Sequence, residues 1–436
     1  MTSPHGLSAV APPPDRGGTS CRPARQTTGS VTGSITESIA GSADRPTTGR
    51  TAADRIGSSA IRDLLALTER PGVISLAGGL PDLDLLDPER IRAAADHAAS
   101  VSGAHGPVAL QYGPTAGLAT LREVVADRLG VDADEVVITT GSQQGLDLLA
   151  RSVIAPGDEV ALQEPAYLGA VQAFRAAGAT VVGLPGDDRG LDVDALSARI
   201  AAGNAPRVVY VVADHHNPTG AVMSPGRRVR LRELADANGI LVIEDAAYRD
   251  LRWGPPTRPL FAPRSPVVHV GSASKVLAPG LRVGWMTGPT DVIDAVLRLK
   301  QAADLHTPTW NQLMVAHLLD DGHQPRHLER IRTAYRSRAV ALADELTSRL
   351  GDAVEVTPPD GGMFLWMTTR DGTDTDGLLD RAIEAGVAFV PGSAFRTRPP
   401  GSDTEADHTT ARLAFASRPE EQLRAAARRL AEVWRP

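Results

Sequence analysis

The stretch PVVHVGSASK, residues 266–275, joins an apolar, valine-rich run to a lysine that stands among small hydroxyl residues. A short β-branched run of this kind predicts a buried strand, and the small residues after it predict a turn at the carboxyl end of that strand. Lys275 would then lie just beyond the strand. A lone lysine is most often a solvated surface charge, but the small and apolar neighbours of Lys275 favour a functional role.

Similar apolar runs occur along the chain and alternate with helical patterns. The runs are EVVITT (135–140), EVALQEP (159–165), RVVYVVA (207–213) and ILVIED (240–245), and helical patterns follow the first three. Short β-branched strands that alternate with helices are typical of a largely parallel sheet covered by helices on both faces. A long helical pattern follows from about residue 289 to residue 350, and the remaining segment mixes strands and helices, which predicts a second α/β layer.

Length and composition limit the class of protein. A chain of 436 residues predicts two or three domains. Residues 1–50 are rich in Ser, Thr, Gly, Pro and Arg and have almost no large apolar side chains, so they predict a disordered tail. The net charge of −7 gives no general attraction to nucleic acid. The single cysteine, Cys21, excludes an intrachain disulfide and a cysteine-based metal site, which fits a cytoplasmic protein.

The sequence predicts no association with membranes. Its apolar runs are shorter than the 18 or so residues that a spanning helix needs, and the N-terminus lacks the apolar core of a secretory signal. We also expect no metal ligand set.

Lysine amines form Schiff bases with carbonyl compounds, and enzymes that use pyridoxal 5′-phosphate (PLP) hold their cofactor in this way. Such a site needs hydroxyls, backbone N–H groups and a cation for the phosphate, and a carboxylate for the pyridine nitrogen. It also needs donors for the 3′-oxygen, a side chain against one ring face and an arginine for the substrate carboxylate. The sequence offers a candidate for each of these parts.

Three candidates stand at the ends of predicted strands. Asp245 ends the strand ILVIED and Tyr248 follows it, while Asn217 begins NPTG (217–220) after RVVYVVA. Ligands of open parallel sheets bind at the carboxyl ends of the strands, so Asp245 would meet the ring nitrogen and the other two the 3′-oxygen. A helix N-cap aspartate, a core tyrosine and an ordinary turn explain the same residues without a ligand.

The phosphate candidates lie on two segments. TTGSQQGLDLL (139–149) predicts a strand, a glycine turn and a helix, whose N-terminus would present N–H groups and a favourable dipole to an anion. The other segment surrounds Lys275 and would supply hydroxyls and a cation. The candidates are Ser142, Gln143, Ser272, Ser274 and Arg282.

The remaining candidates lie on three separate segments of the chain. Tyr167 in QEPAYLG (163–169) would stack on the ring, and Arg412 in RLAFA (412–416) would grip a carboxylate with two parallel hydrogen bonds. Gly79 would let backbone approach a ligand closely. A core tyrosine, an exposed arginine and a plain turn are the alternatives for these three residues.

These motifs together make residues 55–436 similar to the fold-type-I PLP enzymes of the aminotransferase class I/II family. The sequence most resembles the subgroup that contains 2-aminoadipate aminotransferases and the aminotransferase domain of MocR-type regulators, in SSAIRDLLALTERPGVISLAGGLPD (58–82) and LQYGPTAGLATLR (110–122). The resemblance implies a large α/β domain with a mainly parallel seven-stranded sheet at 101–310 and a smaller α/β domain at 311–436. Residues 51–100 would contribute to the small domain.

The resemblance also implies roles for single residues. Lys275 would carry the Schiff base, and the other candidates would have the contacts given above. Tyr112 would reach the phosphate of a neighbouring subunit, which implies a homodimer with shared sites. Ser59 and Arg62 match positions that recognise a distal carboxylate, which favours glutamate or 2-aminoadipate as the amino donor. Asp214, His215 and His216 stand where the family has other residues, and the histidines would line the substrate pocket or pack under it.

The predicted activity is transfer of an amino group between an L-amino acid and a 2-oxo acid. The same residues would also serve a PLP-dependent lyase, decarboxylase or amino-acid cyclase, and the sequence leaves these alternatives open. A transcription factor of the MocR type needs an N-terminal DNA-binding domain, which residues 1–50 do not resemble. We therefore expect small-molecule substrates and neither nucleic acid nor a membrane as a partner.

Overall fold

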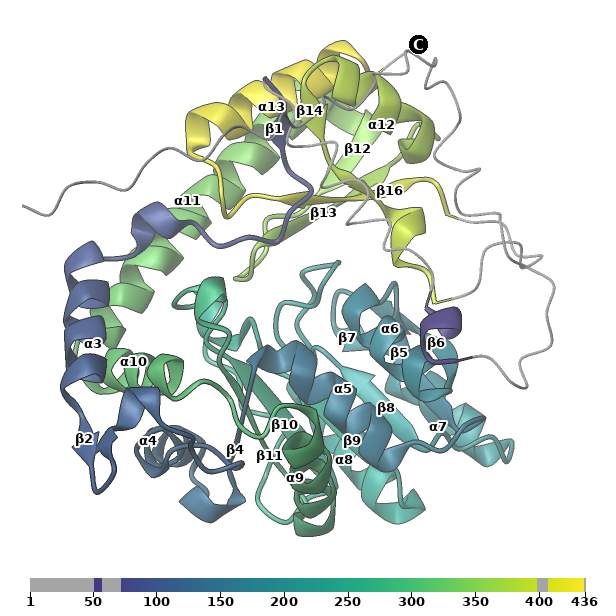
Figure 1. The fold of residues 1–436 in the computed structure, drawn as a ribbon. Coiled ribbons are helices and arrows are strands. Elements are labelled where there is room, and N and C mark those ends of the chain that lie inside the picture. The colour runs from purple at the N-terminus through teal and green to yellow at the C-terminus, as the bar shows by residue number, and fades with distance from the viewer. Residues whose placement is uncertain (1–50, 57–71, 398–406, 435–436) are drawn as a thin grey trace, which may run out of the picture. The chain divides into compact units, whose positions relative to one another are not determined.

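The computed structural model describes residues 51–56, 72–397 and 407–434 (Figure 1). The predicted tail at 1–50 and the candidate residues Ser59 and Arg62 lie outside the described residues. Among the described helices, none is long and apolar enough to cross a membrane.

A large mixed sheet carries the central part of the chain. Four of its strand pairs are parallel, and β11 is antiparallel to both of its neighbours, so the predicted mainly parallel sheet is confirmed. Seven strands form its main part, and the two-residue β7 is added at one edge by a hairpin from β6. In spatial order, the described strands are β4 (Val137–Thr139), β11 (Gly284–Thr287), β10 (Val267–Ser272), β9 (Leu241–Asp245), β8 (Val208–Val211), β5 (Glu159–Glu164), β6 (Thr180–Asp187) and β7 (Gly190–Leu191).

Helices cover this sheet on both faces, because its central strands are apolar on both. Along β8, Val208 and Tyr210 belong to one hydrophobic cluster, while Val209 and Val211 belong to a second. Alternate side chains of a strand point to opposite faces, so the two clusters lie on opposite sides of the sheet. The helices around the sheet are α5 (Gly141–Val153), α6 (Leu168–Ala177), α7 (Val193–Ala201), α8 (Pro225–Asn238) and α9 (Thr290–Ala303).

A smaller sheet follows in the C-terminal part, with the strand order β12-β13-β16-β15 among the described residues. The helical pattern at 289–350 is interrupted twice, at 304–308 and 321–323, and forms α9, α10 and α11. The elements are α10 (Thr309–Asp320), α11 (Gln324–Leu350), β12 (Val354–Val356), β13 (Phe364–Thr369), α12 (Thr375–Glu384), β14 (Val387–Ala388), β15 (Val390–Pro391), β16 (Thr410–Ala414) and α13 (Glu420–Glu432).

The segment that begins at β1 joins this C-terminal part. Strand β1 (Ile74–Ser75) pairs in parallel with β14, and the N–H of Ala414 donates to the carbonyl of Leu76 at 2.7 Å. This hydrogen bond places the segment after β1 next to β16. The expected domain boundaries stay a prediction. Besides β4, the α-helices and strands between β1 and α5 are α3 (Pro88–Ser100), β2 (Ser102–Gly103), β3 (Gly106–Pro107) and α4 (Ala119–Leu129).

Single-turn 3-10 helices connect these elements. They are η1 (Ala53–Arg55), η2 (Leu83–Leu85), η3 (Val108–Leu110), η4 (Ala133–Glu135), η5 (Arg249–Leu251), η6 (Pro279–Leu281), η7 (Gly351–Ala353) and η8 (Gly392–Phe395).

Candidate active site

The carboxyl ends of three adjacent parallel strands bring the central candidates together. Lys275 follows β10, Asp245 is the last residue of β9, and Asn217 lies in the loop after β8. Because the three strands are parallel, their carboxyl ends lie at the same edge of the sheet and bring these polar residues together there.

Lys275 lies close to the segment that follows β1. Its Nζ donates a hydrogen bond of 2.9 Å to the carbonyl of Gly79 and lies 5.7 Å from the centre of the Tyr248 ring. The pKa of the Lys275 amine is lowered to about 8, first by burial and then by the positive charge of Arg412, while Asp245 opposes the shift. A sizeable neutral fraction near neutral pH makes this amine a nucleophile and a base.

Asp245 is a buried carboxylate with neutral donors. Its Oδ2 accepts from the hydroxyl of Tyr210 at 2.9 Å, and its Oδ1 accepts from the N–H of Ala247 at 3.1 Å. Burial raises the pKa of the Asp245 carboxyl, and the hydrogen bond from Tyr210 opposes this shift. Two neutral donors leave acceptor capacity on both oxygens, which suits a further N–H or cationic partner. Tyr210 was not among the residues predicted from the sequence. Its hydroxyl is the polar group of an otherwise apolar strand, and this could have indicated a role in the site.

Asn217, Tyr248 and Arg412 form a connected chain of side chains. The Nδ2 of Asn217 donates to the Tyr248 hydroxyl at 3.3 Å, and the Nη1 of Arg412 donates to the Oδ1 of Asn217 at 2.8 Å. Arg412 lies within β16, where sequence reasoning put it at the start of the strand. All three residues are buried.

The Arg412 guanidinium has no carboxylate partner among the described residues. Its charge centre lies 4.3 Å from the ring centre of Phe364 and 4.9 Å from that of Phe395, and its Nη2 donates to the carbonyl of Ala77 at 2.5 Å. Its Nε is buried and makes no hydrogen bond within the described part of the chain. Burial lowers the pKa of Arg412 to about 10. A buried cation with a free donor suits a bound anion.

The phosphate candidates gather around the N-terminus of α5. Gly141 has a φ of +76°, and a Cβ at this position would overlap the guanidinium of Arg282. The Nη2 of Arg282 donates to the carbonyl of Thr140 at 3.3 Å, which places this cation beside the start of the helix. Ser142 is the second residue of α5 and is half-buried.

The serines on either side of Ala273 are both buried. The Oγ of Ser272 accepts from the N–H of Ser274 at 3.1 Å, so the two residues form one turn after β10. Tyr167 approaches α5 from the loop after β5, where its hydroxyl donates to the Oε1 of Gln143 at 3.2 Å. The pKa of Tyr167 is raised to about 12, first by burial and then by the negative charge of Asp245.

Tyr112 lies apart from this set. The residue is 80% exposed, and its ring makes an edge contact with His306 at 5.8 Å between ring centres.

Asp214, His215 and His216 have packing partners of their own. The two oxygens of Asp214 accept from the guanidinium of Arg228 at 2.7 and 3.3 Å. His215 packs against Gly362, where an added Cβ would lie 2.7 Å from the His215 Cβ, and neither of its ring nitrogens has a partner in the described ranges. Burial lowers the pKa values of His215 and His216 to about 4 and about 3. These observations favour packing under the site over contact with a substrate.

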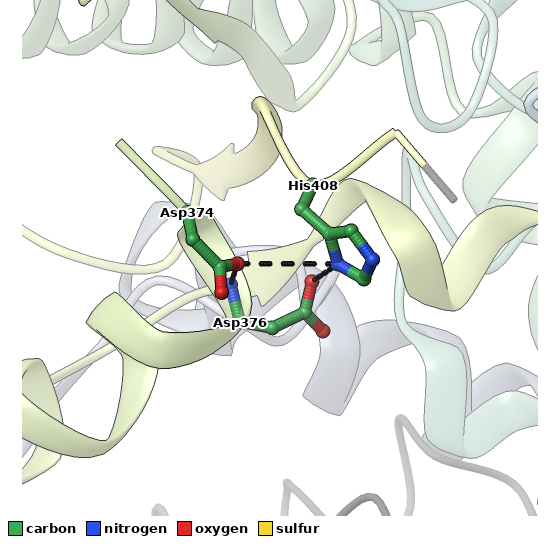
Figure 2. Close-up of side chains that lie close together, drawn as sticks. All are labelled: Asp374, Asp376 and His408. Atoms are coloured by element: carbon green, nitrogen blue, oxygen red, sulfur yellow. Dashed lines mark hydrogen bonds and ion pairs between the residues drawn. The ribbon is translucent and has the colours of Figure 1, made fainter. Parts of the chain in front are cut away.

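A separate group of ionisable residues lies at the start of α12 (Figure 2). Asp374 caps this helix by accepting from the N–H of Asp376 at 2.9 Å. The Nδ1 of His408 lies 2.6 Å from Asp376 Oδ2 and 3.9 Å from Asp374 Oδ1. The hydrogen bond to Asp376 raises the pKa of His408, which favours a protonated imidazole that donates a hydrogen bond over one that ligates a metal.

The sequence and the fold match known proteins over most of the chain. The family model described as "Aminotransferase class I and II" matches residues 71–430. The 2-aminoadipate transaminase of Thermus thermophilus is 42% identical over 384 residues, which are 87% of this chain and 94% of that protein. The aromatic-amino-acid aminotransferase 1 of Thermococcus litoralis is 37% identical, over 86% of this chain and 91% of that protein.

A crystal structure shows the same likeness. The alpha-aminoadipate aminotransferase from Thermus thermophilus, complexed with N-(5′-phosphopyridoxyl)-L-leucine, superposes with a TM-score of 0.80 at 39% identity. The match covers 88% of this chain and 96% of that one. The chain therefore belongs to the aminotransferase class I and II family. Its fold is that of a fold-type-I PLP enzyme, its cofactor is PLP and its reaction is amino transfer, so the lyase, decarboxylase and cyclase alternatives are not favoured.

Proposed function

We propose that this aminotransferase takes its amino group from an acidic L-amino acid, glutamate or 2-aminoadipate, and passes it to a 2-oxo acid in amino-acid metabolism. The observation that carries amino transfer on an α-amino acid is Arg412, a buried guanidinium with a free donor that is held next to Asn217 and whose charge lowers the pKa of Lys275. The likeness to the 2-aminoadipate transaminase of Thermus thermophilus supports the choice of substrate class. Ser59 and Arg62 are the candidates that would recognise the distal carboxylate.

The donors and acceptors around Lys275 fit PLP. Lys275 would form the Schiff base, and Asp245 would accept a hydrogen bond from the pyridine nitrogen, which would satisfy its remaining acceptor capacity. Asn217 and Tyr248 would donate to the 3′-oxygen, and Tyr167 would pack on the ring. The phosphate would be bound by Ser142, Gln143, Ser272, Ser274 and Arg282.

The bound cofactor supplies a ring that accepts electrons from the substrate α-carbon. Lys275 would act as the base at that carbon: its amine would remove the α-proton of the substrate from one side. A pKa lowered to about 8 keeps enough of this amine neutral to accept a proton near neutral pH. Lys275 would pass this proton on to the cofactor, and in the second half of the reaction it would deliver a proton to the α-carbon that comes from the 2-oxo acid, which yields the product amino acid.

Arg412 orients the substrate for this proton transfer. Phe364 and Phe395 lie against its guanidinium, and the carbonyl of Ala77 and the side chain of Asn217 accept from its two terminal nitrogens. A guanidinium fixed at both ends presents its remaining donors in one direction, so the α-carboxylate of the substrate is held with its α-proton towards Lys275.

A homodimer with shared sites is part of the proposal. Leu110, Tyr112 and Leu305 are 79%, 80% and 52% exposed, although each is large and apolar or aromatic. Exposed side chains of this kind suit contact with a second copy of the chain, through which Tyr112 would reach the partner's phosphate group. A cytoplasmic location is also proposed, on the basis of the single cysteine.

The visible absorption spectrum of the purified protein tests this function. Glutamate or 2-aminoadipate should bleach the band of the lysine-bound cofactor, and 2-oxoglutarate or 2-oxoadipate should restore it. Phenylalanine and leucine serve as comparison donors, and a lower second-order rate for both is expected. If no amino acid bleaches the band, amino transfer is rejected. If phenylalanine reacts faster than glutamate and 2-aminoadipate, only the proposed acidic donor is rejected.

A further inference from the structure

A buried lysine and a carboxylate at the end of α9 form a polar network that the reaction does not use directly. The side chain of Lys300 is 0% exposed. Its Nζ lies 2.9 and 3.0 Å from the two oxygens of Asp304, and 3.2 Å from both Gln144 Oε1 and Thr307 Oγ1. Every hydrogen of the ammonium group therefore has an acceptor in reach.

The network ends on Thr140, the N-cap residue of α5. The Thr140 hydroxyl donates to Asp304 Oδ2 at 3.0 Å, and the N–H of Thr140 donates to Gln144 Oε1 at 2.7 Å. The Nε2 of Gln144 in turn donates to Asp304 Oδ2 at 2.6 Å. The carbonyl of Thr140 accepts from Arg282. All three polar groups of this residue are thus fixed by side chains.

This arrangement keeps the first turn of α5 free of a side-chain cap. A threonine at an N-cap usually turns its hydroxyl towards the N–H groups of the first turn. Thr140 makes no such bond, because its hydroxyl is directed to Asp304. The open N–H groups are those of the segment that contains Ser142 and Gln143, to which the proposed function gives the phosphate.

The end of α9 favours only one member of the pair, because Lys300 lies in the last turn, where the helix dipole favours a positive charge. Asp304 is the C-cap residue of α9, where the helix dipole disfavours a negative charge. Lys300 is fully buried, which disfavours its positive charge unless a partner is present. Burial raises the pKa of Asp304, but hydrogen bonds from Gln144 and Lys300 outweigh it and hold the pKa below its usual value, so the carboxylate stays charged and accepts from Thr140.

We propose that Lys300 and Asp304 are positioning residues for the phosphate of the cofactor, an inference that rests on the proposed function. They act through Thr140. The Asp304 carboxylate accepts the Thr140 hydroxyl and keeps it away from the first turn of α5, and Lys300 fixes the position of that carboxylate. Without this restraint the hydroxyl rotates to cap α5 itself and competes with the phosphate for the same N–H groups.

Cofactor binding to the cofactor-free protein tests the proposal. Affinities for PLP and for pyridoxal, which lacks the phosphate, are measured from the absorption band that each forms with Lys275. Asp304→Asn should weaken PLP binding by about tenfold and leave pyridoxal binding within about twofold, because a neutral amide is a weaker acceptor than a carboxylate. Inorganic phosphate, used as a competitor of PLP, should lose affinity in the same proportion.

Variants of Thr140 separate positioning from folding. Thr140→Val should bind PLP as tightly as the wild type does. It removes the hydroxyl that could compete for the N–H groups of α5, together with the hydrogen bond from that hydroxyl to Asp304. Combining it with Asp304→Asn should restore most of the lost PLP affinity. Asp321→Asn is the matched control: Asp321 accepts from Arg90 Nε at 2.7 Å in another, partly buried ion pair, and its replacement should affect the binding of neither ligand.

The outcomes are distinct. The positioning role would be overturned if Asp304→Asn lowered the affinities for PLP and for pyridoxal equally. It would also be overturned if the double variant recovered no affinity for PLP. A wild-type protein that forms no band with either compound would instead reject the proposed function.

Discussion

Arg412 donates a hydrogen bond of 2.8 Å to the side-chain oxygen of Asn217, a residue 195 positions earlier in the chain. Arg412 belongs to β16 of the smaller sheet, and Asn217 follows β8 of the large sheet, so this bond joins the two sheets at the site. The amide nitrogen of Asn217 donates to Tyr248, which fixes the amide orientation and leaves its oxygen for the guanidinium. One asparagine thereby connects the proposed 3′-oxygen contact with the proposed carboxylate contact.

Replacement of Arg412 should separate substrate binding from cofactor binding. Arg412→Lys loses the planar fork that holds a carboxylate with two hydrogen bonds, so kcat/KM should fall by about 100-fold or more for every amino donor. The absorption band of the lysine-bound cofactor should remain. Stopped-flow measurement of band bleaching gives the rate, and Arg429→Lys, on α13, is the control that should leave it unchanged. Loss of the band together with activity would contradict a role confined to the substrate.

The pKa of Lys275 predicts how the cofactor-free protein captures PLP. Only the neutral amine attacks a carbonyl carbon, so the rate of capture should rise about tenfold per pH unit below pH 8 and level off above it. An ordinary lysine, with a pKa of 10.5, would give a rate that still rises at pH 10. The measurement is the growth of the visible band from pH 6.5 to 10. Nα-acetyl-lysine, treated in parallel, corrects for the ionisation of PLP itself.

Asp245 should be needed for amino transfer more than for cofactor capture. Asp245→Asn cannot hold a proton on the pyridine nitrogen, so bleaching by glutamate should slow by about 100-fold while the lysine-bound band still forms. Tyr210→Phe removes one neutral hydrogen bond of 2.9 Å to the same carboxylate and should slow bleaching by only about fivefold. Equal effects of the two substitutions would contradict the assignment of the charge to Asp245.

Much of this site could be predicted from the sequence because its residues follow apolar runs with a clear strand pattern. Strand β6 was missed, since TVVGLPGD contains two glycines and a proline that indicate a turn. The short β11, GWMT, gave no signal of its own. Backbone partners such as the carbonyl of Gly79, and the network of Lys300, join segments more than 150 residues apart. Local periodicity carries no information about such contacts, so they required the structure.

Subunit mixing tests whether sites are shared. In a shared-site dimer, Lys275 and Tyr112 of one site come from different subunits. A mixture of Lys275→Ala and Tyr112→Phe proteins should therefore contain mixed dimers with one intact site each, about one quarter of all sites after random exchange. At limiting PLP, activity should exceed the sum of the two separate variants. Activity equal to that sum, in a protein shown by light scattering to be dimeric, would contradict the shared site.

His215 predicts a loss of stability in mild acid. Burial lowers its pKa to about 4, so between this value and the ordinary 6.5 the unfolded state binds a proton that the folded state does not. The free energy of unfolding should then decrease as the pH falls from 6.5 towards 4, by about 3 kcal/mol for this residue once the pH is below 4.

Replacement of His215 by an apolar residue removes both the titration and two unpartnered ring nitrogens. His215→Leu should therefore reduce the difference in unfolding free energy between pH 7 and pH 5, as measured by urea denaturation, whereas His105→Gln at an exposed position should not. An unchanged difference in His215→Leu would show that His215 reaches solvent and titrates freely.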